Sequence, residues 1–303
     1  MTGSVSISGT PAAGKSTIGR AVSKRLDIPF LSTGDIMRDF AQEEGVSILE
    51  IGRLAQQDRS YDDKVDDRLR ELSDNKRNVV IDSRMAWFFL KHSFSVHIVV
   101  DPLVAAHRAE SRLDQKSENY TSGGSAFAGV VQRAVADRAR FNELYNVDIG
   151  RLRNYNLVLD STAASVGELV DILLSEMNAF ERKKTTRLWL DPSRLFPSED
   201  IRVLRDIDEH AVRRISNIDF LKNNPVSVVY HDPHFVLVDG HKRLSAAIRG
   251  GMRLIPSILE LEGNEEVSGA TAKRILEETL ANKSCLYDWE SVHGVSYRIS
   301  SED

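Results

Sequence analysis

The chain has 303 residues, of which 40 are Lys or Arg and 45 are Asp or Glu, and its formal net charge of −5 accompanies a sequence pI of about 6.0. This length allows two domains with separate hydrophobic cores, whereas the acidic balance disfavours strong binding to bare nucleic acid. The single cysteine, Cys285, excludes an internal disulfide and suits a reducing cytoplasm, and without 18 unbroken apolar residues we expect no membrane span.

The first half of the sequence alternates short apolar runs with helical patterns. The predicted strands cover residues 4–9, 29–32, 78–83, 96–101 and 156–161. The predicted helices cover residues 16–26, 34–45, 62–74 and 167–184. Because the strands are mostly apolar throughout, are rich in Val and Ile and alternate with helices, we predict an α/β fold with a doubly wound parallel sheet.

A glycine-bounded loop joins the first predicted strand to the first helix. It fits the pattern GxxxxGK[ST] and, with the next residue, consists of Gly9, Thr10, Pro11, Ala12, Ala13, Gly14, Lys15, Ser16 and Thr17. Glycines let several N–H groups face a phosphate, and the N-terminus of a helix favours the same anion. Lys15 would then reach the β- and γ-phosphates of ATP, and Ser16 would bind Mg²⁺ through its hydroxyl. An ordinary strand-to-helix turn with an incidental lysine is the alternative.

Polar side chains also accompany the ends of the second and third predicted strands. They are Thr33, Asp35, Arg38, Asp82 and Arg84. Together with the phosphate loop and the run RFNELYNVDIGRLRNYNLVLDST at residues 140–162, they resemble the nucleoside monophosphate kinases, and most closely the cytidylate kinase-like family. The resemblance extends over about residues 4–180.

The resemblance implies a role for each of these side chains. Thr33 and Arg38 would hold the acceptor nucleotide, with Arg38 clamping its phosphate. Arg84 would bind the same phosphate from the other side, or else is an exposed turn arginine. Asp35 would act in catalysis by orienting Mg²⁺-bound water or a phosphate-binding arginine, and Asp82 would add a polar group at the strand edge. The run IDSRMAWFF departs from the pattern of well-known members, so the identity of the acceptor stays open.

A polar, glycine-rich stretch within residues 111–141 is predicted to form a lid over the phosphates. Arg133, Arg138 and Arg140 follow on a predicted helix, and their spacing puts Arg133 and Arg140 on one face. The resemblance implies that Arg133 and Arg140 act in catalysis by neutralising charge on the transferring phosphoryl group, and that Arg138 contacts the substrate. A solvated basic helix face is the alternative. A phosphate acceptor would need no general base, because its oxygen is nucleophilic at neutral pH.

The pattern changes after residue 184, so we predict one domain at residues 1–184 and a smaller α+β domain at residues 185–303. The predicted strands of this second half cover residues 187–191, 226–231, 235–240 and 254–262. The predicted helices cover residues 208–223 and 241–251, with a helical tail from about residue 268. Residues 192–200 read as a loop, and HDPH at residues 231–234 reads as a tight hairpin turn.

Two stretches of the second half, VLVDGHKRLSAAIRGGMRLIP at residues 236–256 and FPSEDIRVLRDIDEHAVRRIS at residues 196–216, resemble the ParB/sulfiredoxin-like fold. The nearest form is that of free-serine kinases, whose motif reads DGHHR. Basic residues at a helix N-terminus can form an anion site. The residues assigned to this site are Arg205, Asp239, Gly240, His241, Lys242 and Arg243. Glu199 or Asp206 would replace the expected glutamate base, and a basic helix start without a ligand is the alternative.

These patterns predict an ATP- and Mg²⁺-dependent kinase that transfers a γ-phosphoryl group to a nucleoside monophosphate of the CMP type, with a second domain that binds a nucleotide or phosphate. One alternative is a bifunctional kinase whose second half phosphorylates a serine-like hydroxyl. Another is a kinase that acts on modified bases in DNA and is guided by its second half, which the net charge of −5 disfavours.

Overall fold

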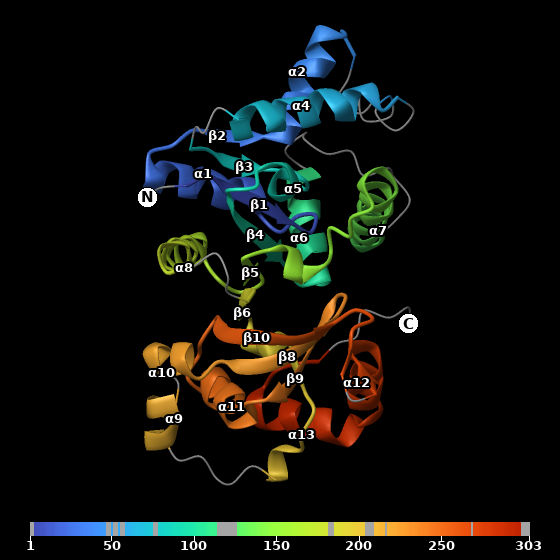
Figure 1. Cartoon of the computed structure of the whole chain (residues 1–303). Helices are drawn as coiled ribbons and strands as arrows, with labels where there is room; N and C mark the ends of the chain where they lie inside the picture. Colours follow the sequence, from blue (N-terminus) through green and yellow to red (C-terminus); the bar gives the residue numbers. More distant parts are fainter. Residues whose placement is uncertain are drawn as a thin grey trace. The chain divides into compact units, whose positions relative to one another are not determined.

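A computed structural model describes most of the chain as two compact units (Figure 1). The described residues are 3–46, 50, 54, 58–74, 78–113, 126–180, 185–203, 209–215, 217–267 and 269–297. The first unit consists of Met1–Gly9, Gly14–Ile98 and Val166–Arg182, and the second of Thr10–Ala13, Val99–Ser165 and Lys183–Asp303. Among the described residues, no helix has both the length and the hydropathy needed to cross a membrane.

The first unit contains a parallel sheet in the order β2-β3-β1-β4. Its elements are β1 (Val5–Gly9), α1 (Lys15–Leu26), β2 (Phe30–Ser32), α2 (Thr33–Glu43), α4 (Ser60–Asp74), β3 (Val80–Asp82), α5 (Ala86–Phe89), β4 (Phe94–Val99) and α8 (Val166–Asn178). Every residue of β1, β3 and β4 is buried, as expected for strands that are covered on both faces. The predicted α/β fold with a parallel sheet is therefore confirmed.

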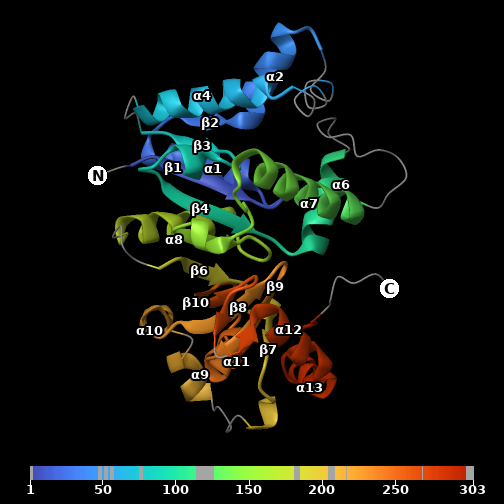
Figure 2. The ribbon, with the colours of Figure 1, turned by 45° about the vertical axis from the view of Figure 1, so that its right-hand side comes forward.

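The second unit combines the segment after β4 with most of the second half. Its helices are α6 (Pro102–Leu113), α7 (Ala126–Tyr145), α9 (Glu209–Ile215), α10 (Ile218–Asn223), α11 (His241–Arg249), α12 (Ala272–Ala281) and α13 (Lys283–His293), with short 3₁₀ turns η1 (Leu152–Asn154), η2 (Pro192–Arg194) and η3 (Ile201–Val203). Helices α6 and α7 lie side by side (Figure 2). Residues Val99–Ser165, which the sequence analysis grouped with the first half, thus belong to this compact unit.

The strands of the second unit run in the order β5-β6-β10-β8-β9-β7. They are β5 (Leu157–Asp160), β6 (Arg187–Leu190), β7 (Leu195–Pro197), β8 (Val226–His231), β9 (His234–Asp239) and β10 (Ile255–Glu262), with a small separate pair formed by β11 (Glu266–Val267) and β12 (Ala270–Thr271). Strands β8 and β9 form the antiparallel hairpin expected at HDPH, and β5 pairs with β6 in parallel. This sheet therefore mixes parallel and antiparallel neighbours.

Two parts of the second half differ from the sequence prediction. Residues 192–200 were expected to be a loop but contain β7, which pairs with β9. The helix expected at residues 208–223 consists of α9 and α10, because the Asn217 side chain accepts hydrogen bonds from the N–H groups of Asp219 and Phe220 and so starts a new helix. Asn282 caps α13 in the same way and separates it from α12.

A continuous apolar core joins the segment after β4 to the second half. Buried residues on both sides of residue 184 belong to it, among them Val99, Leu152, Val158, Leu188, Phe235 and Trp289. Burial of such side chains is the main favourable contribution to folding. The segment that carries α7 is therefore stabilised by packing against the second half.

A buried carboxylate reinforces this junction. The Glu262 side chain is 5% exposed and accepts hydrogen bonds from the backbone N–H groups of Leu152 (2.6 Å) and Arg153 (3.1 Å). The Arg151 side chain donates a third from Nε at 3.3 Å. Burial raises the pKa of Glu262, while the hydrogen bonds from the two backbone N–H groups lower it. Glu262 thus fastens η1 to the end of β10.

We expect Glu262→Gln to lower the free energy of unfolding by about 2 kcal/mol, because an amide nitrogen would face a buried backbone N–H that then has no acceptor. Urea denaturation followed by circular dichroism measures this loss. Glu260→Gln is the matched control, since exposed Glu260 accepts a hydrogen bond from Ser227 Oγ that glutamine can also accept. Equal unfolding midpoints for the two variants would contradict the assigned role of Glu262.

Candidate active site

The loop between β1 and α1 has the backbone of an anion-binding nest. Ala12 and Gly14 have positive φ values of 57° and 85°, and α1 begins directly afterwards at Lys15. Left-handed residues that alternate with right-handed ones turn successive N–H groups to one side of the chain. The N-terminus of α1 adds its own N–H groups and partial positive charge. The predicted phosphate loop therefore has the local conformation that its sequence pattern requires.

Gly9 sets the path of this loop where β1 ends. Its φ of 149° lies in a region that side chains disfavour, and it pairs with Ile98 of β4. A Cβ atom at this position would lie 2.2 Å from the Ile98 carbonyl oxygen. Glycine is therefore required at this position, where β1 and β4 pass close to each other.

Asp82 links the phosphate loop to the strand on its other side. Ser16 Oγ donates a hydrogen bond of 2.5 Å to Asp82 Oδ2. Asp82 is the buried last residue of β3, and its backbone carbonyl accepts a hydrogen bond of 3.4 Å from Thr33 Oγ1. The residues predicted for the donor side and for the acceptor side therefore meet at Asp82.

His97 is a buried neighbour that the sequence pattern did not reveal. It lies on β4 opposite Ser8 of β1. Burial, aided by the positive charge of Lys15, lowers the pKa of His97 to about 3. The imidazole is therefore neutral at neutral pH and does not add a second positive charge beside Lys15.

Helix α2 presents the predicted acceptor residues. Ser32 caps the helix by accepting a hydrogen bond from the Gly34 N–H at 3.2 Å. Asp35, in the first turn, forms an ion pair with Arg38 and a longer contact of 3.8 Å with Arg20 of α1. The sequence analysis missed Arg20, although its place four residues after Ser16 on the same helix is a signal that could have found it.

The remaining predicted acceptor residue, Arg84, lies two residues after Asp82 in the turn between β3 and α5. Its backbone carbonyl accepts a hydrogen bond of 2.9 Å from Trp87 Nε1, which fixes the turn. The structure therefore brings Ser16, Asp82 and Thr33 together, with Arg84 close in sequence to this group.

The predicted lid arginines lie on α7, while the lid stretch at 114–125 is outside the described residues. Arg133 is exposed and Arg140 is half-buried, with its guanidinium 6.0 Å from the Phe141 ring centre. Arg138, which the sequence analysis assigned to the substrate, donates hydrogen bonds to the carboxylates of Asp148 and Asp232.

The start of α11 is built around His241. Gly240 has a φ of 101° and α11 begins at the next residue. His241 is buried, and its Nε2 accepts hydrogen bonds from the N–H groups of Ser198 and Glu199, both at 3.2 Å. Nδ1 then carries the proton, 3.6 Å from Glu199 Oε2. Burial lowers the pKa of His241, so the neutral form is favoured.

The other residues of this predicted anion site have different surroundings. Arg243 forms a 2.5 Å ion pair with Asp239 and donates hydrogen bonds to the backbone carbonyls of Asn224 and Pro225. Lys242 is exposed. Arg205 and Asp206 lie outside the described residues.

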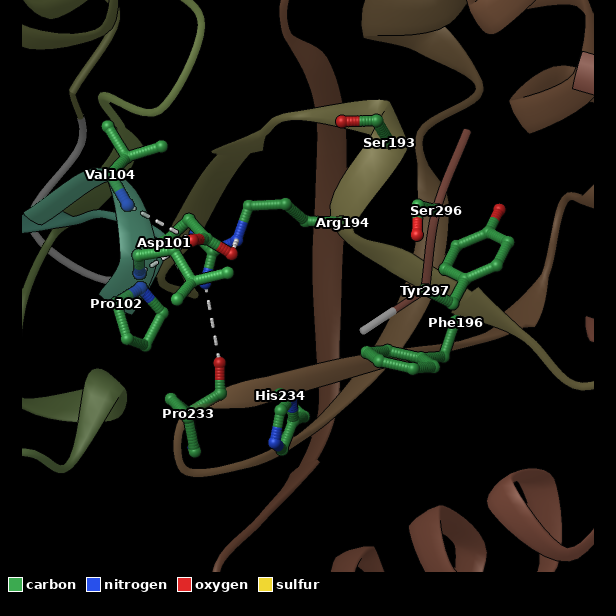
Figure 3. A pocket seen from close by; sticks show the side chains of 11 residues that line it. Asp101, Pro102, Val104, Ser193, Arg194, Phe196, Pro233, His234, Ser296 and Tyr297 are labelled. Carbon is green, nitrogen blue, oxygen red and sulfur yellow. Dashed lines mark hydrogen bonds and ion pairs between the residues drawn. The ribbon is translucent and has the colours of Figure 1, made fainter. Parts of the chain in front are cut away.

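A cavity of about 300 Å³ in the second unit was not predicted from the sequence (Figure 3). The start of α6, the turn at Pro233 and the rings of Phe196 and Tyr297 line it. Arg194 reaches into it but donates to buried Asp160 at 2.6 Å and to the Pro233 carbonyl at 3.4 Å. Through these hydrogen bonds, Arg194 connects β5 to the turn between β8 and β9, which gives it a structural role.

Comparisons with known proteins find relatives that match slightly more than half of this chain. A model of the family described as cytidylate kinase-like matches residues 4–163. The cytidylate kinase of Methanosphaera stadtmanae is 25% identical over 169 residues, which cover 56% of this chain and 94% of that protein. That of Methanococcoides burtonii is 28% identical over 175 residues, covering 58% and 97%.

Two further proteins are similar to part of this chain. An S-adenosylmethionine-dependent nucleotide dehydratase of Lacinutrix mariniflava is 31% identical over 171 residues, 56% of this chain, but the match spans 35% of that protein's length. Among solved structures, a shikimate kinase from Bacteroides thetaiotaomicron has 18% identity and a TM-score of 0.44, covering 58% of this chain and 98% of that one.

We expect Gly9→Ala to lower the free energy of unfolding by about 3 kcal/mol, because the added Cβ meets the backbone of Ile98, which cannot move aside within the sheet. Gly251→Ala is the matched control: its φ of 66° is also positive, but nothing lies within 4 Å of the added atom. Backbone strain there should cost about 1 kcal/mol. Equal losses in urea denaturation would show that the contact with Ile98 is unimportant.

Proposed function

Since the chain belongs to the cytidylate kinase-like family, and is therefore an ATP-dependent kinase, we propose that it transfers the γ-phosphoryl group of ATP to a nucleoside monophosphate of the CMP type. The observation that carries this proposal is the position of Asp82. Its side chain accepts a hydrogen bond from Ser16 of the phosphate loop, and its carbonyl accepts one from Thr33 on the acceptor side. A donor and an acceptor held by these two elements would lie next to each other.

On the donor side, the nest at Gly9–Ser16 would bind the phosphates of ATP, and the Lys15 ammonium would reach the β- and γ-phosphates. The Ser16 hydroxyl and the Asp82 carboxylate are hard oxygen donors, which fit Mg²⁺. Within the described ranges, no group of three or more His, Cys, Asp or Glu residues could hold a metal. This suits Mg²⁺, which takes few protein ligands and completes its shell with phosphate oxygens and water. When bound, it neutralises charge on those oxygens.

On the acceptor side, Arg38 and Arg84 would bind the phosphate of the monophosphate, and Thr33 would help to hold the nucleotide. Asp35 contacts both Arg38 and Arg20, so it would orient the first and bring a second guanidinium to the site. The names of the similar proteins, cytidylate kinases and a nucleotide dehydratase, support a nucleotide acceptor. The acceptor's own phosphate oxygen would be the nucleophile, so no general base is required.

The arginines of α7 would supply the remaining positive charge. Arg133 and Arg140 are seven residues apart and share one helix face. In phosphoryl transfer, positioned cations provide most of the stabilisation of the transition state. We assign this role to Arg133 and Arg140.

For the second half, we propose a ParB/sulfiredoxin-like domain that binds a nucleotide or phosphate at the start of α11. The left-handed Gly240, the helix start and the exposed Lys242 support this proposal. Arg243 would contribute little, because Asp239 and backbone carbonyls already engage it. Glu199, 3.6 Å from His241, favours a second candidate activity in which it is the base that activates a serine-like hydroxyl.

The full-length protein with Mg²⁺ and ATP should release ADP when CMP is added, in an assay that compares CMP, UMP, dCMP, AMP and L-serine. Lys15→Ala should lower the rate with CMP at least about 100-fold, because the triphosphate loses its ammonium partner. Lys24→Ala, at an exposed site on the same helix, is the control. Wild-type protein without turnover on any monophosphate would overturn the proposal. ADP release with L-serine that survives Lys15→Ala would assign that activity to the second half.

Arg38→Ala should raise KM for the acceptor about tenfold or more and leave KM for ATP within about twofold, because Arg38 is proposed to contact the acceptor phosphate. Steady-state kinetics with each substrate varied in turn measures both constants. Arg25→Ala serves as the reference, because it removes an exposed ion pair with Asp171 near the C-terminal end of α1. A parallel rise of both KM values would count against the acceptor site.

A further inference from the structure

Ser161, the residue directly after β5, contacts the backbone of the phosphate loop. Its Oγ donates a hydrogen bond of 2.9 Å to the carbonyl oxygen of Ala13, 148 residues away in the chain. Ser161 is 3% exposed and Ala13 is 0% exposed. Because both groups have left water, the Ala13 carbonyl cannot exchange this donor for solvent without a cost in free energy.

Arg108 of α6 orients the Ser161 hydroxyl. Its Nη1 donates a hydrogen bond of 3.2 Å to Ser161 Oγ, and its Nη2 donates one of 2.7 Å to the Ser161 carbonyl. A hydroxyl has one proton and two lone pairs, so a lone pair faces the guanidinium and the proton faces a carbonyl. The Val99 carbonyl, 3.2 Å from Oγ, already accepts a hydrogen bond from the Ser161 N–H. The Ala13 carbonyl is therefore the better acceptor for the hydroxyl proton.

The backbone that carries Ser161 is held on both sides. The preceding residue, Asp160, is 0% exposed and accepts a hydrogen bond of 2.6 Å from Arg194. The following residue, Thr162, accepts one of 2.9 Å from the Asp101 N–H through its Oγ1 and donates one of 3.0 Å from its own N–H to Asp160. A side chain supported in this way has a defined position.

The hydrogen bond to Ala13 also determines the direction of the next N–H group in the loop. The peptide bond between Ala13 and Gly14 is trans. A trans peptide is planar, and its C=O and N–H point in opposite directions. With the Ala13 carbonyl turned toward Ser161, the Gly14 N–H points away from Ser161.

Local steric effects do not hold this peptide in one orientation. Gly14 has a φ of 85°, and a Cβ added to it would find nothing within 4 Å. Glycine adopts positive and negative φ values about equally well, so rotation of the peptide meets no side-chain barrier. A contact from elsewhere in the fold is needed to select one orientation, and the hydrogen bond from Ser161 supplies it.

We propose that Ser161 is a positioning residue for ATP: through the Ala13 carbonyl, it keeps the Gly14 N–H directed at the bound phosphates. This inference rests on the proposed binding of ATP by the nest at Gly9–Ser16. It adds a residue that the pattern GxxxxGK[ST] does not contain, and it gives the end of β5 a part in holding the triphosphate.

The test measures binding of phosphates to the full-length protein by calorimetry, with Mg²⁺ in excess. Ser161→Ala should raise Kd for ATP about tenfold, because one N–H is no longer held toward the phosphates. Inorganic tripolyphosphate, which has neither base nor ribose, is the second probe, and its Kd should rise by the same factor. In the ADP-release assay, KM for CMP should stay within about twofold of the wild-type value.

Ser257→Ala is the matched control. Ser257 is 2% exposed, and its Oγ also donates to a backbone carbonyl, that of Ile255 at 3.2 Å. Each variant loses one buried hydrogen bond, so both melting temperatures should fall. At a temperature where both variants are folded, Ser257→Ala should keep Kd for ATP and for tripolyphosphate within about twofold of wild type.

The outcomes separate the two proposals. Wild-type protein that binds neither ATP nor tripolyphosphate overturns the proposed function and this inference with it. Wild-type protein that binds both, with unchanged Kd values in Ser161→Ala, overturns the inference and leaves the kinase assignment intact. A rise in Kd for ATP alone would place the effect at the base or ribose and would also overturn the inference. Equal rises in Ser161→Ala and Ser257→Ala would do the same, because lost stability would then explain both.

Discussion

The candidate active site depends on the place of Asp82 at the end of β3. Strand β3 pairs with β1 on one side and with β2 on the other, and all of these strands are parallel. The carboxyl ends of parallel strands meet at one edge of the sheet, so Ser16, after β1, and Thr33, after β2, both reach Asp82. A register shift of one residue in β3 would turn the Asp82 side chain to the other face and lose the contact with Ser16.

The phosphate loop and the strands of the first unit were largely predictable, because their sequence patterns are local. The phosphate loop is a contiguous segment whose spacing reflects a close passage at Gly9 and left-handed residues before α1. Its strands are short apolar runs and appear with small shifts at their ends. The surroundings of the site were not predictable in this way. His97 lies beside β1, and Arg20 contacts Asp35, because of strand pairing and helix packing.

In the second unit, local sequence patterns fail to predict some of the conformations and contacts that distant residues determine. Strand β7 is three residues long and ends in Pro197, so the pattern suggested a loop, and its pairing with β9 decides its conformation. Arg138 shows the same limit for a side chain. The sequence places it on α7 with Arg133 and Arg140, but its partner Asp232 is distant in the chain. Helical spacing separates the faces of a helix without telling which protein group lies against each face.

Two carboxylates of the second half contact the segment that carries α7. They differ in burial, so the loss of each is expected to have a different effect on stability. Glu262 is 5% exposed and satisfies backbone N–H groups that have left water, so its loss would leave buried donors without an acceptor. Asp232 is 45% exposed, and water can replace its hydrogen bond to Arg138 at small cost in stability. Burial therefore makes Glu262 a determinant of folding, whereas Asp232 adds an exposed ion pair to a fold that forms without it.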